Sequence, residues 1–311
     1  MKAITFDSFG GPEVLNVSDL PDPKAGPGEV LVRVAASTVN PTDLMMRNGA
    51  QAKMMEQLAP PYVAGMEFSG VIEDAGDSGL AVGQPVIGVL NPRTPRGGSY
   101  AELIAVPAAS VAAVSASVDL VGAATVPMNA LTAILSLNFL DLKPGDTLLV
   151  TGGAGMLGGS VIQLAKAAGV KVLANVGDKD RALVRGLGAD VILPRDNFDD
   201  ALRAECPDGV DGMIDGALIG NDVSHLVRDG GGAVSLRGTY KIEDPRLRVF
   251  NVSVLTGMED NDAIQHIADM LGSGALVPRV APNGRYAYSD VVKAHQATEA
   301  GGTRGRVVLV F

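Results

Sequence analysis

The pattern of apolar and polar positions changes character twice along the chain. In the first part, short apolar runs alternate with clusters of proline and glycine, which is typical of an antiparallel β-rich domain. A long middle part alternates strand-like and helix-like segments, and the last part returns to β character. We therefore expect a β-rich domain over residues 1–121 and 275–311, with an α/β domain inserted over residues 122–274.

The same pattern predicts individual elements. In the β-rich parts we predict a helix at 289–299 and strands at residues 30–35, 70–73, 85–90, 100–106, 276–280 and 306–311. In the middle part we predict six strands, at residues 148–150, 170–176, 191–193, 212–215, 233–236 and 252–255. Six strands that alternate with helices fit a doubly wound parallel sheet with right-handed crossovers.

The strongest signal is a glycine-rich turn between an apolar strand and a helix. Gly153, Gly155 and Gly158 fill the G-x-G-x-x-G template. We expect Gly153 to permit a sharp turn, Gly155 to let backbone N–H groups approach a pyrophosphate, and Gly158 to bring the helix close to the strand. The positive end of the helix would help to hold the anion. The candidate cofactor-binding residues of the turn are Gly153, Ala154, Gly155, Met156, Leu157 and Gly158.

The residues after the turn support a dinucleotide site. Val161, Leu164, Ala165 and Ala168 recur at helical spacing and give one apolar face for docking on a sheet. Gly169 is expected to end this helix, and the apolar run after it is consistent with a buried parallel strand. The alternative interpretation is a glycine-rich turn that only packs.

Composition restricts the function classes. The chain has 311 residues, of which 47% are hydrophobic and 19% are charged, so we expect a folded protein. The formal net charge of -10 disfavours nonspecific binding to nucleic acid or anionic lipid. No uninterrupted apolar stretch of about 20 residues and no secretion signal are evident, so we predict a cytoplasmic protein with no membrane partner.

Metal chemistry has little support in the sequence. The chain has one cysteine, Cys206, and three histidines that lie far apart, whereas a structural zinc site commonly needs four clustered ligands. We therefore predict no metal site. Cys206 is interpreted as a partly buried thiol near a loop.

Taken in order, several short motifs resemble the medium-chain dehydrogenase/reductase superfamily, in particular its zinc-independent, quinone oxidoreductase-like (zeta-crystallin-like) branch. Nearly the whole chain takes part, through residues 28–34, 40–43, 65–72, 97–102, 131–133, 142–146, 152–158 and 304–309. The resemblance implies an α/β protein in which a GroES-like substrate domain accompanies a Rossmann domain, with the active site in the cleft between them.

Two departures from the zinc-dependent alcohol dehydrogenases of this superfamily are informative. Asn40 stands in the segment that carries their first catalytic ligand, a cysteine, and Met66 replaces a histidine ligand. Without a Lewis acid, oxidation of an ordinary alcohol is disfavoured. Reduction of a quinone or an α,β-unsaturated carbonyl compound needs no metal, so we predict that reaction, with a small, apolar, conjugated acceptor.

The resemblance makes Asn40 the leading polar residue near the substrate or nicotinamide, with Asp43 to orient it. The local alternative for Asn40 is a turn residue before Pro41. Tyr62 is a third catalytic candidate, since it could donate a hydrogen bond to a carbonyl, although a packing role is favoured. No proton donor is assigned.

Glu67 is expected to pair with a buried cation such as Arg33 or Arg47. Four methionines and Leu58 would form an adaptable apolar wall or lid for the acceptor, or else a helix that packs into the core or a dimer contact. The methionines are Met45, Met46, Met54 and Met55.

The cofactor is predicted to be NADPH, with NADH as the less favoured alternative. Asn175 stands where NAD-dependent relatives carry an acidic residue, and it would not repel a 2′-phosphate. Lys179 and Arg181 could supply positive charge to a 2′-phosphate, or they could be ordinary solvated charges. The negative charge of Asp178 argues against a 2′-phosphate at this place.

Thr132 is a candidate neighbour of the nicotinamide half of the cofactor, as is Asn129. Two other functions stay open. One is an enoyl-thioester reductase, for which Arg93 and Arg96 form the tempting basic pair, and the other is a noncatalytic NADP-binding sensor. The resemblance also implies a homodimer, for which residues 249–255 are a candidate edge strand.

Overall fold

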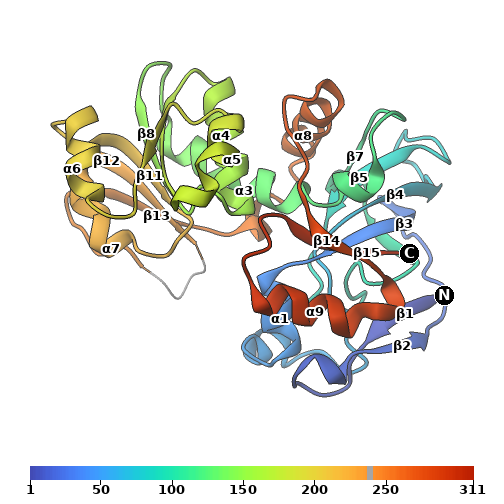
Figure 1. The fold of residues 1–311 in the computed structure, drawn as a ribbon. Coiled ribbons are helices and arrows are strands. Elements are labelled where there is room, and N and C mark those ends of the chain that lie inside the picture. The colour runs from blue at the N-terminus through green and yellow to red at the C-terminus, as the bar shows by residue number, and fades with distance from the viewer. Residues whose placement is uncertain (237–240) are drawn as a thin grey trace. The chain divides into compact units, whose positions relative to one another are not determined.

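The structure of the chain, a computed structural model, describes residues 1–236 and 241–311. The chain forms two compact units, which Figure 1 shows together with their element labels. The first unit contains Met1–Met128 and Met258–Phe311, and the second contains Asn129–Gly257. Within the described residues, every helix is too short or too polar to span a lipid bilayer.

The first unit is built around a seven-stranded sheet with a long central strand, β3 (Glu29–Val39). Its strand order is β14 (Val280–Ala287), β15 (Arg306–Val310), β3, β4 (Glu67–Asp74), β5 (Pro85–Val89) and β7 (Val111–Ala113), and β6 (Leu103–Pro107) also pairs with β3. All pairs are antiparallel except β14 with β15. A separate antiparallel pair is formed by β1 (Lys2–Thr5) and β2 (Asn16–Asp19). The predicted β-rich domain is therefore confirmed.

Four helices belong to this unit: α1 (Pro41–Arg47), α2 (Leu120–Ala123), α8 (Asn261–Ser273) and α9 (Val291–Ala300). Short 3-10 turns lie at Pro12–Val14, Ala52–Met55, Ala108–Ser110 and Tyr288–Asp290. The compact unit includes α2 and α8, whereas the sequence-based boundaries at residues 121 and 275 leave α8 in the α/β domain. The reason is packing, since the Asn261 side chain donates a hydrogen bond to the Val111 carbonyl.

The second unit contains a six-stranded parallel sheet, as predicted. Its strand order is β10 (Val191–Leu193), β9 (Lys171–Asn175), β8 (Thr147–Thr151), β11 (Val210–Asp215), β12 (Val227–Leu236) and β13 (Arg248–Val252). Numbered from β8, this is the order 3-2-1-4-5-6 of a Rossmann fold. The switch point lies beside β8, so the turn after β8 is at the place where such sheets bind dinucleotides.

Helices cover both faces of this sheet. The helices of the unit are α3 (Pro127–Leu140), α4 (Met156–Ala167), α5 (Arg181–Gly186), α6 (Phe198–Glu205) and α7 (Gly220–Val223). In Figure 1, α4 and α5 lie on one side of the strands, and α6 and α7 lie on the other. The buried cluster under α6 and α7 includes Leu149, Leu173 and Met213. Alternate residues of these strands, such as Leu148 and Val172, are also fully buried, as expected for a sheet covered twice.

Three sequence-based details are wrong. The strand predicted at 252–255 ends at Val252, because a 3-10 turn (Val254–Gly257) follows it. The strand predicted at 276–280 begins only at Val280, since the Leu276 N–H bonds the end of α8 at the Met270 carbonyl. Ala168, expected on the apolar face of α4, is exposed after the helix end, although Gly169 does follow as the stop, with φ +77.

Candidate active site and nucleotide site

A buried carboxylate organises the polar residues that follow β3. Glu67, at the start of β4, is fully buried and accepts hydrogen bonds from Thr38 Oγ1 (2.6 Å), Asn40 Nδ2 (3.0 Å) and the Met128 N–H (2.9 Å). The predicted pairing of Glu67 with Arg33 or Arg47 is wrong, because these arginines bind other carboxylates. Hydrogen-bond donors therefore take the place of a counter-ion around Glu67.

Arg33 binds Glu73 on the neighbouring strand, and both side chains are largely exposed. Arg47 is buried at the end of α1. It bonds the Glu299 carboxylate, the Gly10 carbonyl and His295 Nδ1 (3.1 Å). Burial, with Arg47 beside it, lowers the pKa of His295 to about 3, so this histidine is neutral and has a packing role.

Hydrogen bonds to this network orient the Asn40 side chain and leave its Oδ1 atom without a partner among the described residues. Its side chain is fully buried, and Nδ2 donates to both Thr38 Oγ1 (2.9 Å) and Glu67 Oε1. These two acceptors fix the orientation of the amide. Asn40 Oδ1 is buried without a hydrogen-bond partner among the described residues. Because a buried acceptor without a partner is rare, Asn40 Oδ1 is available for a donor on a bound molecule.

Asp43 holds two backbone segments together beside Asn40. Its carboxylate accepts the Asn40 N–H (2.8 Å) at the start of α1 and the Gly65 N–H (3.0 Å). Burial raises the pKa of Asp43 to about 7, a rise that the two N–H donors and the charge of Arg306 oppose and that of Glu67 increases. The predicted orienting role of Asp43 thus has a geometric basis, since Asp43 acts on the Asn40 backbone.

Tyr62 lies in an aromatic cluster instead of this network. Its ring stacks on Phe9, with centroids 5.8 Å apart, and tilts against Phe6, and its hydroxyl donates to the Leu58 carbonyl (3.4 Å). This position supports the packing role that the sequence favours.

The methionines divide between core and surface. Met46 and Met55 are buried in the core, Met45 is partly exposed, and Met54 is 56% exposed. Met66 is buried at the position where zinc-dependent relatives have a histidine ligand. In the described part of the chain, no group of three or more His, Cys, Asp or Glu side chains is arranged to hold a metal ion.

The glycine-rich turn connects β8 with α4. Gly152, with φ +64, takes the left-handed conformation, so the turn depends on Gly152 where the sequence suggested Gly153. A Cβ on Gly153 would instead meet Ala174 and Val176 at 3.2 Å, which gives this glycine a packing role against β9. The close packing expected at Gly158 is present, because a Cβ there would lie 2.4 Å from the Gly152 carbonyl oxygen. Gly155 is the N-cap of α4, and no side chain caps the helix.

A second loop is held against this turn by a buried aspartate. Asp215, at the end of β11, accepts Thr151 Oγ1 (2.5 Å) and the Gly220 N–H (2.7 Å), and Thr151 Oγ1 accepts the Ala217 N–H (3.1 Å). A Cβ on Gly152 would lie 3.0 Å from the Gly216 carbonyl carbon. The loop after β11 therefore forms a wall beside the glycine turn.

The ends of β9 and β10 meet through a side-chain hydrogen bond. Asn175 Nδ2 donates to the Pro194 carbonyl (2.8 Å), which brings the next residue, Arg195, over Gly177. Arg195 Nε lies 3.7 Å from where a Cβ on Gly177 would be. Neither Arg195 nor Lys179 forms an ion pair or side-chain hydrogen bond with another described residue. Two exposed cations thus flank the end of β9.

Arg181 differs from those two cations, because it faces the Asp178 carboxylate at 3.6 Å. Sequence reasoning missed Arg195. The sequence gives only part of the signal. Arg195 lies two residues after the strand predicted at 191–193, at the carboxyl edge of the sheet, whereas its neighbour Gly177 follows another strand. The candidates Asn129 and Thr132 both lie on α3, and Asn129 is buried. They are three residues apart and so share one face of the helix.

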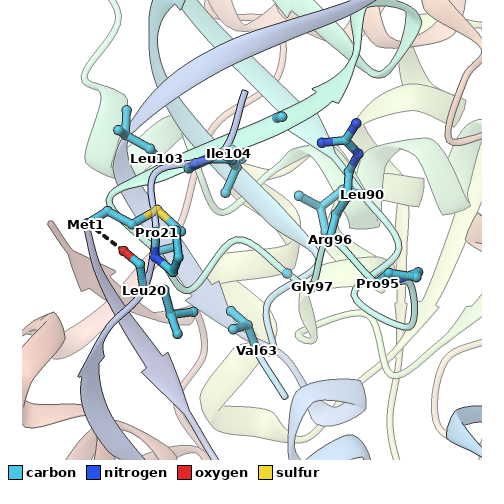
Figure 2. A pocket seen from close by; sticks show the side chains of 14 residues that line it. Met1, Leu20, Pro21, Val63, Leu90, Pro95, Arg96, Gly97, Leu103 and Ile104 are labelled. Carbon is cyan, nitrogen blue, oxygen red and sulfur yellow. Dashed lines mark hydrogen bonds between the residues drawn. The ribbon is translucent and has the colours of Figure 1, made fainter. Parts of the chain in front are cut away.

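The first unit also contains a cavity of about 300 Å³ that is separate from Asn40 and Glu67. Figure 2 shows Met1 and Leu20 at one side of this pocket and Pro95 and Arg96 at the other. Arg96 binds the Glu29 carboxylate at 2.5 Å. Arg93 instead contacts Gln51, so the two arginines that the sequence suggested as a pair have different partners.

Comparison with known proteins agrees with this geometry. Residues 26–116 match the alcohol dehydrogenase GroES-like domain, and residues 187–309 match the zinc-binding dehydrogenase family. The chain is 30% identical to 2-methylene-furan-3-one reductase of Solanum lycopersicum over 99% of this chain and 79% of that protein. It belongs to the medium-chain dehydrogenase/reductase superfamily, in the quinone oxidoreductase-like branch.

Other members of this superfamily are similar over the full chain. The NADPH-dependent alkenal/one oxidoreductase of Arabidopsis thaliana, a chloroplastic protein, is 29% identical over 99% of this chain and 79% of its own. The quinone oxidoreductase of Coxiella burnetii is 27% identical, with a TM-score of 0.86 over 100% of this chain and 99% of that one. A mycobacterial protein solved with NADPH is 29% identical, with a TM-score of 0.82 over 100% of both chains. The α/β class with GroES-like and Rossmann parts is thereby confirmed.

Proposed function

We propose that this protein is an NADPH-dependent reductase that delivers a hydride to a quinone or to an α,β-unsaturated carbonyl compound. The observation that carries the proposal is the glycine turn at the switch point of a Rossmann sheet, in a chain whose relatives include NADPH-dependent and quinone oxidoreductases. NADPH, when bound, supplies the hydride from its nicotinamide ring. The residues of the chain bind the cofactor and the acceptor and orient them for hydride transfer.

The residues after β8 fit a dinucleotide. No side chain caps the N-terminus of α4, and the first-turn N–H groups of a helix attract a pyrophosphate. The missing side chain of Gly158 lets this helix pack closely on the turn. The candidates Ala154, Met156 and Leu157 would contribute through their backbone. Asp215 and Thr151 position the wall beside this turn.

The two exposed cations at the end of β9, Lys179 and Arg195, are called the strand-end cations here. They suit the 2′-phosphate, which NADPH has in addition to the phosphates of NADH. Lys179 and Arg195 lie where the adenosine ribose of a dinucleotide is held in Rossmann sheets, and an arginine there accommodates a 2′-phosphate. Asn175 brings Arg195 to this place and adds no negative charge. Arg181 would add to the positive potential from beside Asp178.

Asn40 would contact the nicotinamide half of the cofactor. Its Oδ1 atom is an acceptor, so its partner must be an N–H or O–H group; an acceptor carbonyl of the substrate would not satisfy it. Asp43 keeps the Asn40 backbone in place. Asn129 and Thr132 remain predicted neighbours of this half of the cofactor.

The reaction needs no metal in this proposal. Hydride adds to the β-carbon of an enone or to a quinone, and the resulting enolate or hydroquinone monoanion takes one proton from solvent. The segment of residues 40–43 holds no cysteine, and Met66 stands in place of a histidine. Both departures support metal-free reduction, because none of these side chains binds zinc in the way that cysteine or histidine does.

Stopped-flow measurement of NADPH absorbance tests the proposal. We expect oxidation of NADPH on mixing with a quinone such as menadione or an enone such as 3-buten-2-one. Tight NADPH binding without oxidation by any acceptor would instead indicate a noncatalytic sensor. Oxidation of NADPH by an enoyl thioester alone would indicate an enoyl-thioester reductase.

We also propose a cytoplasmic homodimer that binds neither nucleic acid nor membrane. β13 pairs only with β12 within the described sheet, so its other edge is available to a second copy. The net charge of -10 supports the absence of nucleic-acid binding. Sedimentation of a monomer at micromolar concentration would contradict the dimer.

A further inference from the structure

Arg93 differs from four other arginines of the β-rich unit. Arg33, Arg47, Arg96 and Arg285 each face a carboxylate. Arg93 is partly buried, and its one side-chain contact among the described residues is a neutral acceptor, Gln51 Oε1, at 2.8 Å from Nη1. A guanidinium has five N–H donors, so most of the donors of Arg93 remain available.

The position of Arg93 is fixed from both ends. Its backbone N–H donates to Asn91 Oδ1, which orders the loop after β5. Its guanidinium is held by Gln51, whose Nε2 donates to Thr42 Oγ1 (3.1 Å) on the first turn of α1. Thr42 lies between Asn40 and Asp43 in the sequence, so this chain of contacts ends at the candidate active site.

The electrostatics of Arg93 also indicate proximity to that site. Burial lowers the pKa of Arg93, and the nearby Asp43 carboxylate opposes this effect. Asp43 already accepts two backbone N–H groups and has a pKa of about 7, so it is a poor counter-ion for Arg93. A partly buried cation without a strong counter-ion is stabilised by binding an oxyanion.

We infer that Arg93 binds an oxyanion carried by the acceptor, so that the preferred acceptor is an acidic conjugated carbonyl compound. This inference rests on the proposed reductase function. The planar guanidinium suits a carboxylate, which it can bind through two parallel N–H donors. The phosphate of a coenzyme A thioester offers the same chemistry from another source. The partly exposed Met45, whose carbonyl accepts the Gln51 N–H, supplies apolar surface nearby.

Two matched acceptor pairs test the inference. The first pair is 4-oxo-2-pentenoate and its methyl ester, and the second is crotonyl coenzyme A and crotonyl N-acetylcysteamine. We expect the wild-type protein to prefer the charged member of one pair by about tenfold in kcat/KM, as one charge-assisted contact would give. The pair that shows the preference identifies the source of the oxyanion.

Arg93→Gln should remove most of that preference, and Arg93→Lys should restore part of it. Arg96→Gln is the matched control, since Arg96 binds Glu29, and it should keep the wild-type preference. Thermal unfolding and NADPH binding of each variant check that it is folded. Binding of saturated 4-oxopentanoate to the NADPH complex, measured by calorimetry, should likewise weaken about tenfold in Arg93→Gln.

Equal kcat/KM within both pairs, or a preference that survives Arg93→Gln, would overturn the inference while leaving the reductase function intact. Failure of the wild-type protein to oxidise NADPH with any quinone, enone or thioester would overturn the reductase function itself.

Discussion

The two compact units build their sites from different parts of the chain. In the parallel-sheet unit, backbone atoms form most of the candidate site, because the turn after β8 needs glycine for its conformation and its close contacts. In the β-rich unit, side chains form most of the candidate site. Glu67, Asn40 and Asp43 are buried and make hydrogen bonds within this group and to the nearby backbone. A backbone site is therefore sensitive to added atoms, and a side-chain site is sensitive to lost hydrogen bonds.

The largest expected effect is that of an added side chain in the glycine turn. Gly158→Val would place atoms against the Gly152 carbonyl oxygen and the Gly153 Cα, which are backbone atoms that cannot yield easily. We expect NADPH affinity to fall about 100-fold or more, corresponding to the roughly 3 kcal/mol of an overpacked site. Calorimetric titration of NADPH measures the loss.

Gly186→Ala is the control for that variant. A Cβ on Gly186, at the end of α5, would have nothing within 4 Å, so affinity should stay at the wild-type value. Unchanged NADPH binding by Gly158→Val would show that the backbone of the turn does not decide the site.

The opposite manipulation removes hydrogen bonds from the β-rich unit. Glu67→Leu leaves the Thr38 hydroxyl, the Asn40 amide and the Met128 N–H without their acceptor. We expect the free energy of unfolding to fall by about 3 kcal/mol, since each unsatisfied buried donor costs about 1–3 kcal/mol. Urea unfolding measures this change. Glu73→Gln, which alters the exposed pair with Arg33, should cost less than about 1 kcal/mol.

The strand-end cations provide an intermediate case, in which side chains complete a backbone site. The double variant Lys179→Ala/Arg195→Ala should weaken NADPH binding by about 10- to 100-fold and leave NADH binding nearly unchanged, because only NADPH carries the 2′-phosphate. The ratio of the two dissociation constants is the measurement. Arg185→Ala, on the exposed side of α5, is the control. An equal loss for both cofactors would place the 2′-phosphate elsewhere.

The most gradual effect, spread over about three pH units, concerns the titration of Asp43. Burial raises the pKa of this carboxyl from 3.8 to about 7, so the folded protein keeps a proton that the unfolded chain releases between these pH values. The free energy of unfolding should therefore fall as pH rises from about 4 to about 7, by up to about 1.4 kcal/mol per pH unit from this group. Asp43→Asn should remove that slope, and Asp77→Asn, on the surface, should keep it. Parallel stability curves for wild type and Asp43→Asn would contradict the raised pKa.

The same contrast explains what could be predicted from the sequence. The Rossmann sheet and the place of its turn were predicted correctly because their signals are local, with alternating elements and glycines at fixed spacing. The glycine that takes the left-handed conformation, Gly152, was not predicted. The partners of Glu67 and Arg47 were predicted wrongly because they lie far away along the chain. Arg195 was missed for a related reason, since its place over Gly177 depends on two strands that pair side by side.

Element ends were the other weak point. The strand expected at 276–280 and the one expected at 252–255 are apolar runs, but the contacts of neighbouring backbone decide where pairing begins and stops. Apolar character alone does not distinguish a strand from a 3-10 turn over four residues.

The position of β15 has a consequence for how the molecule is made. Strand β3, near the start of the chain, is completed by Arg306–Val310, and Arg47 reaches Glu299 across a sequence separation of 252 residues. During synthesis the edge of β3 that receives β15 must wait until residues 306–310 have left the ribosome. The inserted Rossmann unit contains all six of its own strands and can close earlier. The emergence of residues 306–310 therefore decides when the sheet around β3 can finish folding.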